Sequence, residues 1–267
     1  MRDIAIAAGK RAGEALRAIE ECAKLSPVSD AAAEAKALRY RVYDLEKRLT
    51  LALGTGRARQ WRLCVLITES LCAGRHWEDV AGGALRGGAD CLQLREKELG
   101  AAELLARATR LVALCAQHRA SCIVNDRPDI ALLAKADGVH LGQTDLSAPE
   151  VRKFAGLALL VGVSTTNMDK AHAAARDGAD YCGLGPMFPT STKHKPTLAG
   201  PAYLLDYLAD AQTARIPHLA IGGINAANAA SLTAAGGRGI AVSSAVCGAP
   251  DPERTCQELL AVLRKPQ

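Results

Sequence analysis

The chain has 267 residues, a formal net charge of +5 and 49% hydrophobic residues, enough for one large α/β domain or a smaller domain with an appendage. Aromatic residues make up only 3%, which argues against a stacking platform for single-stranded nucleic acid. The positive charges form no dense basic block, so neither nucleic acid nor a membrane is an expected partner. No apolar stretch reaches about 18 residues, the length that spans a bilayer.

The cysteines and the first residues indicate a compartment. Nine cysteines are an odd number, and no two of them form a C-x-x-C pair. Most lie within apolar patterns, where a free cysteine behaves as a small core residue. The first residues reach acids too soon for a secretory signal. We therefore expect a reduced, cytoplasmic protein without a zinc site.

Residues 1–53 have the pattern of two helices. Ala12, Leu16, Ile19 and Ala23 are spaced to form one apolar stripe, and Leu38, Val42, Leu45 and Leu49 form another. Ser26-Pro27 is expected to break the helices apart, with Ser29 or Asp30 capping the second and Gly54-Thr55-Gly56 ending it. The prediction is a helical hairpin followed by a short linker.

After Trp61 short apolar runs alternate with Ala-rich stretches of helical period. Fully apolar strands that alternate with helices indicate a parallel sheet covered on its outside. The predicted strands are Leu63–Ile67, Cys91–Leu94, Ser121–Val124, Gly138–Leu141, Leu159–Val163, Tyr181–Leu184, His218–Ile221 and Gly239–Val242.

A short phrase recurs before several of these strands. It reads Gly88-Ala89-Asp90, Ala136-Asp137-Gly138, Gly178-Ala179-Asp180 and Gly236-Gly237-Arg238-Gly239. Such repetition suits a closed eight-strand barrel better than an open sheet. We therefore expect an α/β fold, a (β/α)8 TIM barrel over residues 57–267, with a helical extension and linker over residues 1–56.

Polar residues gather where the predicted strands end, and in such a barrel these positions surround the active-site mouth. Alternation along the second strand directs Gln93, Arg95 and Lys97 to one side. Asn125 and Asp126 follow the third strand. The other strand ends supply Asp145, Ser164, Thr190, Ser191, Thr192, Lys193, Gly223, Ser243 and Ser244.

The last strands carry the pattern of a phosphate site. Gly222-Gly223 precedes a helix start, and Ser243-Ser244 follows the eighth strand. A Gly-rich turn with a helix start presents backbone N–H groups to an anion. Gly222-Gly223 alone could be a tight turn, but together with Lys193 and the serines it favours phosphate binding.

Two acids at neighbouring strand ends, Asp126 and Asp145, face the basic residues Arg95 and Lys97. Carboxylates suit Mg²⁺, which keeps several waters and shares the phosphates of a substrate. A diphosphate between metal and cations would account for all four side chains. The alternative is ordinary surface ion pairing, which the clustering at three consecutive strands disfavours.

Histidines are weaker candidates. His140 lies within the fourth predicted strand and is expected to be a packed or supporting residue rather than a base. His194 lies in the hydroxyl-rich loop between two lysines, where contact with a ligand and plain solvation stay open. The sequence contains no G-x-S-x-G elbow, P-loop or Rossmann fingerprint.

In this order the motifs resemble those of the thiamine-phosphate synthase (thiamine-phosphate pyrophosphorylase) family. They are QLREK, VNDRPDIALLAKADGVHLGQTD, GVSTTN, DGADYCGLGPMFPTSTK, AIGGI and VSSAV, from about Trp61 to the end of the chain. The resemblance implies a Mg²⁺-dependent transferase that joins hydroxymethylpyrimidine diphosphate to hydroxyethylthiazole phosphate. It releases diphosphate by a dissociative path and forms thiamine monophosphate.

The resemblance also implies residue roles. The pyrimidine diphosphate would contact the QLREK motif, Asn125 and Ser164, and the thiazole phosphate would contact Gly223, Ser243 and Ser244. Asp126 and Asp145 would bind Mg²⁺. Ser164, Arg95, Lys97 and Lys193 would be catalytic, and Thr190, Ser191 and Thr192 would contact the thiazole phosphate or diphosphate. Within QLREK, Leu94 stands where the family often has an aromatic residue, Glu96 follows Arg95, and Ser191 stands where an acid can occur.

Two other functions stay open. A thiazole tautomerase of the same fold would not need the metal and diphosphate residues, and a non-catalytic phosphate binder would not need the acid pair. The extension resembles helical domains fused ahead of this synthase in some bacteria, for which a pyrimidine-phosphate kinase role has been suggested. It contains no recognisable phosphate-binding loop, so a packing or interface role is favoured. Small-molecule substrates are the expected partners, and a homo-oligomer is left open.

Overall fold

A computed structural model describes residues 2–25, 30–54, 60–190 and 198–263, with the side chains of residues 2, 3, 5, 6 and 47–54 excepted. The chain forms two compact units, one of two helices and one a barrel with its surrounding helices. The predicted helix break at Ser26-Pro27, the cap candidate Ser29 and the predicted domain boundary at residue 56 fall outside the described residues. The division into residues 1–56 and 57–267 therefore stays a prediction.

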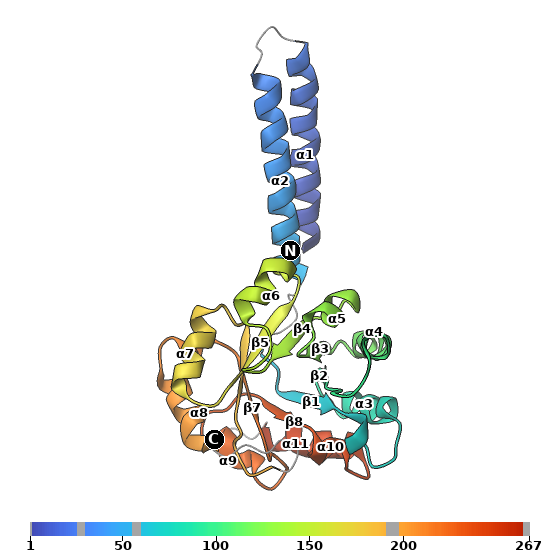
Figure 1. Ribbon diagram of the computed structural model, residues 1–267, viewed down its shortest axis with the longest axis vertical. Helices are drawn as coiled ribbons and strands as arrows, with labels where there is room; N and C mark the ends of the chain where they lie inside the picture. Colours follow the sequence, from blue (N-terminus) through green and yellow to red (C-terminus); the bar gives the residue numbers. More distant parts are fainter. Residues whose placement is uncertain (1, 26–29, 55–59, 191–197, 264–267) are drawn as a thin grey trace. The chain divides into compact units, whose positions relative to one another are not determined.

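The first unit is a hairpin of two long helices, α1 (Arg2–Lys24) and α2 (Ala31–Gly54), which pack along each other (Figure 1). Small residues let the helices approach closely, because a Cβ on Gly13 would lie 2.8 Å from Cε1 of Tyr43. An ion pair also bridges them, with Arg39 Nη2 2.9 Å from Glu20 Oε2 and the Glu20 side chain buried.

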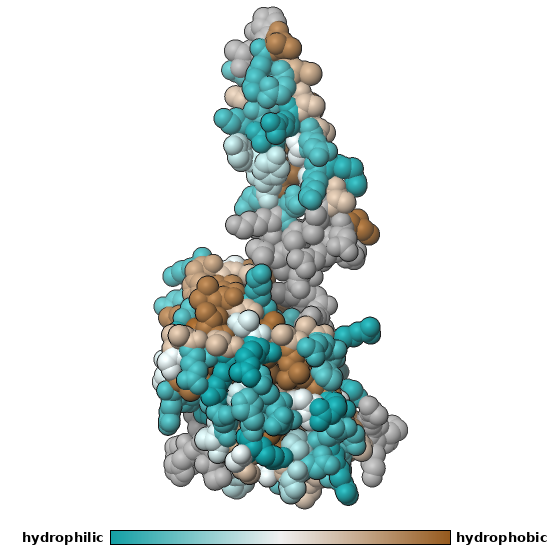
Figure 2. Space-filling view, turned by 90° about the vertical axis from the view of Figure 1, so that its right-hand side faces the viewer, coloured by the Kyte–Doolittle hydropathy of each residue, from teal (hydrophilic) through white to brown (hydrophobic). Residues whose placement is uncertain are grey.

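The apolar stripes expected on these helices are only partly buried, with Leu16, Ala23 and Val42 half-buried and other described members exposed. Ile19 is 55% exposed, Leu38 46% and Leu45 57%, whereas Glu20 and Ala35 are buried. Small residues and the Glu20–Arg39 pair also contribute to the contact between the two helices. Figure 2 shows hydrophobic and hydrophilic residues mixed on the visible face of the hairpin.

The second unit is a closed barrel of eight parallel strands in chain order, so the predicted (β/α)8 fold is confirmed (Figure 1). Pairing of β1 with β8 completes the closure, with Cys64 opposite Ala241. The strands are β1 (Leu63–Ile67), β2 (Cys91–Leu94), β3 (Ser121–Asn125), β4 (Gly138–Leu141), β5 (Leu160–Thr165), β6 (Tyr181–Leu184), β7 (His218–Ile221) and β8 (Ile240–Val242).

Helices surround the strands. The α-helices are α3 (Trp77–Arg86), α4 (Ala101–Gln117), α5 (Pro128–Leu133), α6 (Ala148–Ala155), α7 (Met168–Arg176), α8 (Gly200–Ala209), α9 (Ala229–Ala234), α10 (Ser244–Cys247) and α11 (Pro252–Leu263), with short 3-10 turns at Glu69–Leu71 and Thr213–Arg215. No helix among the described residues is long and apolar enough to cross a membrane.

Five of the predicted strands, including Cys91–Leu94 and Tyr181–Leu184, coincide with the observed ones. The other three differ by one or two residues at an end, and two of these differences bear on the site. Strand β3 extends to Asn125 and β5 extends to Thr165, so Asn125 and Ser164 are held by strand pairing rather than by loops.

Two apolar layers form the core of the barrel. Alternate strand residues such as Val65, Leu92 and Val161 face outward and pack under the helices. The others fill the interior, where Trp61 and Tyr181 meet edge to face with their ring centroids 5.0 Å apart. This packing fills the interior near the amino ends of the strands, so a ligand can enter only from the carboxyl ends.

The recurring phrase before the strands has a structural role. Asp90 accepts backbone N–H bonds from Arg62 and Leu63, Asp137 accepts one from Cys122, and Asp180 accepts one from Val161. Each aspartate thus precedes one strand and holds the start of the strand before it. In the last pair of strands the roles reverse, because the backbone N–H of Arg238 donates to Nε2 of His218 at 3.2 Å.

The His218 ring predicts how stability depends on pH. Burial, together with the smaller effect of the nearby charge of Arg238, lowers the pKa of His218 to about 4. At pH values between about 4 and the ordinary histidine pKa of about 6.5, His218 binds a proton in the unfolded chain but not in the folded barrel. This contribution to stability is complete above pH 6.5 and is lost as pH falls.

We expect the free energy of unfolding to fall by up to roughly 3 kcal/mol through this residue as pH drops from about 6.5 to about 4. Urea denaturation at a series of pH values measures it. The His218→Gln variant keeps an acceptor for the Arg238 N–H but does not titrate, so its stability should vary less over this range. An equal slope in variant and parent would contradict the assignment.

Candidate active site

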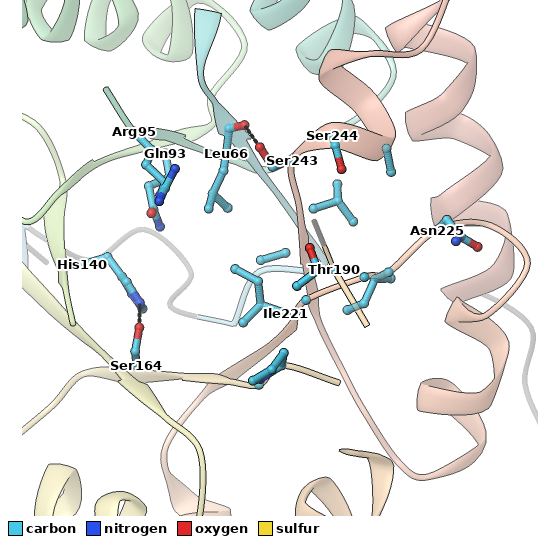
Figure 3. Close-up of a pocket in the computed structure, with 18 of the residues that line it drawn as sticks. Leu66, Gln93, Arg95, His140, Ser164, Thr190, Ile221, Asn225, Ser243 and Ser244 are labelled. Atoms are coloured by element: carbon cyan, nitrogen blue, oxygen red, sulfur yellow. Dashed lines mark hydrogen bonds between the residues drawn. The ribbon is translucent and has the colours of Figure 1, made fainter. Parts of the chain in front are cut away.

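A cavity of about 420 Å³ opens among the carboxyl ends of the strands (Figure 3). The polar side chains in its wall come from most of the strands or from the segments that follow them. The predicted site residues that line the cavity are Gln93, Arg95, Asn125, Ser164, Thr190, Gly223, Ser243 and Ser244. These predicted residues therefore line one cavity, while their roles stay a prediction.

Strand β2 directs two polar side chains into the cavity. Gln93 and Arg95 line it, as the alternation predicted. Gln93 is buried, and its Oε1 has no hydrogen-bond partner among the described residues. A buried acceptor without a partner costs about 1–3 kcal/mol, so a donor on a bound ligand would relieve this cost.

The other residues of the QLREK motif lie elsewhere. Leu94 is buried in the outer core, and Glu96 accepts the backbone N–H of Glu69 at 2.8 Å and pairs with Arg107. Neither side chain lines the cavity, so the structure gives Leu94 and Glu96 packing and supporting contacts. Lys97 contacts the carboxylate of Asp126.

The two predicted acids come together. The carboxyl groups of Asp126 and Asp145 interact directly, and Gly142 donates its backbone N–H to Asp145 Oδ2 at 2.7 Å. Burial raises the pKa of Asp145, and the neighbouring Asp126 raises it further. Burial acts in the same direction on Asp126, but hydrogen bonds from Lys97 and Asp145 outweigh it and hold the pKa of Asp126 below its ordinary value. Without a cation between them, the pair is thus arranged to share a proton.

This acid pair is compatible with a hard divalent cation such as Mg²⁺. Among residues 2–25, 30–54, 60–190 and 198–263, no group of three or more His, Cys, Asp or Glu side chains is placed to hold a metal. Zinc sites usually use such a group, whereas Mg²⁺ is commonly held by one or two carboxylates together with substrate phosphates and water. Asp126 and Asp145 supply those two carboxylates.

The opposite side of the cavity is built from glycine and serine. Gly222 and Gly223 follow β7 with φ of +104° and +64°, in the left-handed region that glycine tolerates. A Cβ on Gly223 would lie 2.3 Å from the carbonyl oxygen of Pro189, so no other residue fits there. Ser243 donates its hydroxyl to the Leu66 carbonyl at 3.0 Å, and Ser244 begins α10 beside it.

Three predicted site residues, Ser191, Thr192 and Lys193, lie outside the described residues, as does His194. Thr190, directly before them, lines the cavity opposite Gln93 and His140 in Figure 3. The apolar part of the wall was not predicted. It includes Leu66, Pro186, Ile221 and Ile224, whose character as lining residues depends on the closed barrel.

His140 has a more specific place than the sequence analysis gave it. It is buried, as expected for a packed residue, but it also lines the cavity. Its Nε2 lies 2.9 Å from Ser164 Oγ, and its Nδ1 lies 3.1 Å from the hydroxyl of Tyr181. The signal in the sequence was its inward position on β4, whereas both partners depend on the register of β4, β5 and β6.

Comparison with known proteins gives consistent results. A family model described as thiamine monophosphate synthase matches residues 63–246, and one described as ThiD2 family matches residues 1–48. The chain is 43% identical over 251 residues to the thiamine-phosphate synthase of Thermosynechococcus vestitus, covering 94% of this chain and 70% of that protein. It is 45% identical over 207 residues to that of Moorella thermoacetica, covering 77% and 97%.

Solved structures agree with the sequence relatives. The thiamine phosphate pyrophosphorylase from Pyrococcus furiosus superimposes with a TM-score of 0.69 and 33% identity, covering 78% of this chain and 96% of that one. A 3-hexulose-6-phosphate synthase superimposes with a TM-score of 0.58 and 23% identity, covering 75% and 99%. This second likeness shows the barrel fold alone.

The acid pair yields a prediction that needs no ligand. Replacing Lys97 by Met should raise the pKa of Asp126, because the cation that stabilises its carboxylate is lost. Titration of the aspartate carboxyl carbons by ¹³C NMR measures this pKa. Lys153→Met, which changes an exposed lysine on α6, serves as the control. An unchanged Asp126 pKa in Lys97→Met would show that the two side chains do not interact in solution.

Proposed function

Because this chain belongs to the thiamine monophosphate synthase family, we propose which residues of its cavity carry out the family's condensation. The enzyme is a transferase that joins hydroxymethylpyrimidine diphosphate to hydroxyethylthiazole phosphate and forms thiamine monophosphate and diphosphate. The assignment of roles rests on one observation, that different kinds of residue line the two sides of the cavity. Cations and acids lie at the ends of β2 to β4, and glycine and serine lie at the ends of β7 and β8.

The first group of residues suits the pyrimidine diphosphate. Gln93 Oε1 is a buried acceptor without a partner among the described residues, and Ser164 supplies a hydroxyl from β5. Arg95 and Asn125 line the same part of the wall and add N–H donors for phosphate oxygens. Lys97 lies next to them on Asp126.

The second group suits the thiazole phosphate. Gly223 brings its backbone close to the cavity, and the first N–H groups of α10, at Ser244 and Ala245, have no partner within the helix. Ser244 and Thr190 add hydroxyl donors. Ser191, Thr192 and Lys193 are proposed for the same ligand, or for the diphosphate, from their place in the motif after β6.

We assign Mg²⁺ to Asp126 and Asp145. When bound there, Mg²⁺ would supply positive charge that neutralises the diphosphate of the substrate. The proximity of the two carboxyl groups supports the assignment, because burial and each other's charge disfavour leaving both ionised without a cation. Lys97 already places one positive charge beside the carboxylate of Asp126.

The chemistry then depends mainly on the departure of the diphosphate. The bond between the pyrimidine methylene carbon and the diphosphate oxygen breaks, and its electron pair stays on that oxygen. Arg95 and Lys97 stabilise the negative charge that develops there, and Lys193 is proposed to assist. The thiazole nitrogen then donates its lone pair to the methylene carbon.

Two other functions predict different requirements. A thiazole tautomerase would act on the thiazole phosphate alone, and a phosphate binder would show no turnover. The interacting pair Asp126 and Asp145, with Lys97 on it, favours the synthase because neither alternative needs a diphosphate and metal site. The residues that line the cavity all belong to the barrel. We therefore propose that the reaction takes place in residues 57–267 and that the extension has a packing or interface role.

The metal assignment predicts the effect of removing one acid. Asp126→Ala should lower turnover at least roughly 100-fold. Loss of this carboxylate would weaken Mg²⁺ binding and so remove positive charge that stabilises the departing diphosphate. Formation of thiamine monophosphate from both substrates in a Mg²⁺ titration measures this. Asp129→Ala, which changes an exposed aspartate three residues away, should keep turnover near that of the parent. Full activity of Asp126→Ala in excess chelator would overturn the assignment.

The two-sided cavity predicts a reciprocal pattern of binding. Ser244→Ala should weaken thiazole phosphate by about tenfold and leave pyrimidine diphosphate nearly unchanged, because one hydrogen bond to a charged group is lost. Gln93→Leu, of similar volume, should show the reverse. Calorimetry with each ligand measures both. Equal losses for the two ligands in either variant would contradict the division of the cavity.

A further inference from the structure

A chain of hydrogen bonds runs from the barrel interior to the cavity wall. Tyr181 on β6 meets Nδ1 of His140 at 3.1 Å, and Nε2 of His140 meets Ser164 Oγ at 2.9 Å. Figure 3 shows the second bond, with Ser164 and His140 on the same side of the cavity as Gln93. Ser164 and His140 line the cavity, whereas Tyr181 lies below them. The proposed function uses Ser164 and leaves the other two without a role.

The Tyr181 hydroxyl defines the direction of these bonds. Tyr181 is fully buried, and among the described residues the one hydrogen-bond partner of its hydroxyl is His140 Nδ1. Burial raises the pKa of Tyr181 well above its ordinary value, so the phenol keeps its proton. A buried hydroxyl hydrogen without an acceptor is costly, so the hydroxyl donates to Nδ1.

The tautomer of His140 follows from that donation. A nitrogen that accepts a hydrogen bond carries no proton, so the neutral ring carries its proton on Nε2. Nε2 then donates to Ser164 Oγ. A doubly protonated ring would donate at both nitrogens and leave the Tyr181 hydrogen without an acceptor.

The barrel holds both rings in this arrangement. Gly162 is the cross-strand partner of Tyr181, and a Cβ there would lie 2.0 Å from Cζ of the phenol. A Cβ on Gly183 would lie 2.9 Å from Cε1 of His140. Trp61 packs against the other side of Tyr181. Because both glycines lack a Cβ, the two rings have room to lie where the Tyr181 hydroxyl meets His140 Nδ1.

We propose that Tyr181 and His140 are positioning residues that fix Ser164 as a hydrogen-bond donor toward the cavity. Ser164 Oγ accepts from His140, so its own hydrogen is directed to a ligand atom with a lone pair. Gln93 Oε1 is an acceptor without a partner in the same wall. A donor and an acceptor together match a ring nitrogen beside an exocyclic amino group. This inference rests on the proposed function for the identity of the ligand, an aminopyrimidine.

The arrangement discriminates by polarity. An oxo-pyrimidine of nearly the same shape presents an N–H where the aminopyrimidine has a bare ring nitrogen, and a carbonyl where the other has an amino group. That pattern would set donor against donor at Ser164 and acceptor against acceptor at Gln93. Buried polar groups left without partners in this way account for the largest selectivity ratios among similar ligands.

The test removes one hydroxyl. In Tyr181→Phe the ring packing is kept, but Nδ1 loses its donor and the proton is free to move to Nδ1. Ser164 would then donate to Nε2 instead of to the ligand. We expect the affinity for pyrimidine diphosphate to fall roughly three- to tenfold, with the affinity for thiazole phosphate unchanged. In a Ser164→Ala background the same substitution should cause no further loss.

A matched control is available. Tyr203 is also buried, and its hydroxyl donates to Thr165 Oγ1 at 2.7 Å, next to Ser164 but outside the cavity wall. Tyr203→Phe removes an equivalent buried hydroxyl and should leave both affinities unchanged. Equal effects of Tyr181→Phe and Tyr203→Phe would indicate a general loss of packing and would overturn the proposal.

A second measurement does not depend on any substrate. Imidazole ¹⁵N chemical shifts of His140 in the full chain distinguish a protonated Nε2 from a protonated Nδ1. We expect a neutral ring with the proton on Nε2 in the parent and loss of this single tautomer in Tyr181→Phe. A ring protonated at Nδ1 or at both nitrogens in the parent would overturn the proposal. Failure of the parent to bind pyrimidine diphosphate would instead overturn the proposed function and leave the NMR result to judge the tautomer.

Discussion

The hydrogen bonds between β1 and β8 close the sheet, and the position of every functional side chain depends on that closure. In a closed parallel barrel all strands end at one mouth, so residues far apart in the chain meet around a single cavity. Arg95 and Ser243 line the same cavity although their strands are the second and the eighth. Closure also pairs the edges of the first and last strands. The polar side chains at the mouth therefore need not cover an open edge and can bind ligands.

The two sides of the cavity would stabilise the negative charge of a phosphate group by different interactions. At the ends of β7 and β8 the anion would meet backbone N–H groups and hydroxyls, which carry partial charges and need no counter-ion. At the ends of β2 to β4 it would meet full charges, and the acids there bring their own repulsion. A phosphate that is only held suits the first environment, whereas a diphosphate that gains charge as it leaves suits the second.

Much of this arrangement could be predicted from the sequence. The apolar runs predicted the strands, and alternation predicted that Gln93 and Arg95 point to one side, and both line the cavity, whereas Leu94, which the motif had suggested as a ligand contact, does not. The role of His140 could not be predicted, because its bonds to Ser164 and Tyr181 depend on the register of three strands. In the hairpin, periodicity identified the helices, whereas the contact of Glu20 with Arg39 between them could not be predicted from an apolar pattern.

The contacts that hold the strand starts also bear on the order of assembly. They join β1 to β2, β3 to β4, β5 to β6 and β7 to β8, and they close loops of only 28, 15, 19 and 20 residues. The bond from Ser243 to Leu66, where the last strand meets the first, closes a loop of 177 residues. The entropy lost on closing a loop grows with its length, so neighbouring strands can associate locally at a smaller cost. Backbone hydrogen bonds also join the starts of other neighbouring strands, such as the Ser121 N–H to the Asp90 carbonyl. Pairing of neighbouring strands can therefore precede closure, and the mouth that carries the chemistry is completed only when β8 meets β1.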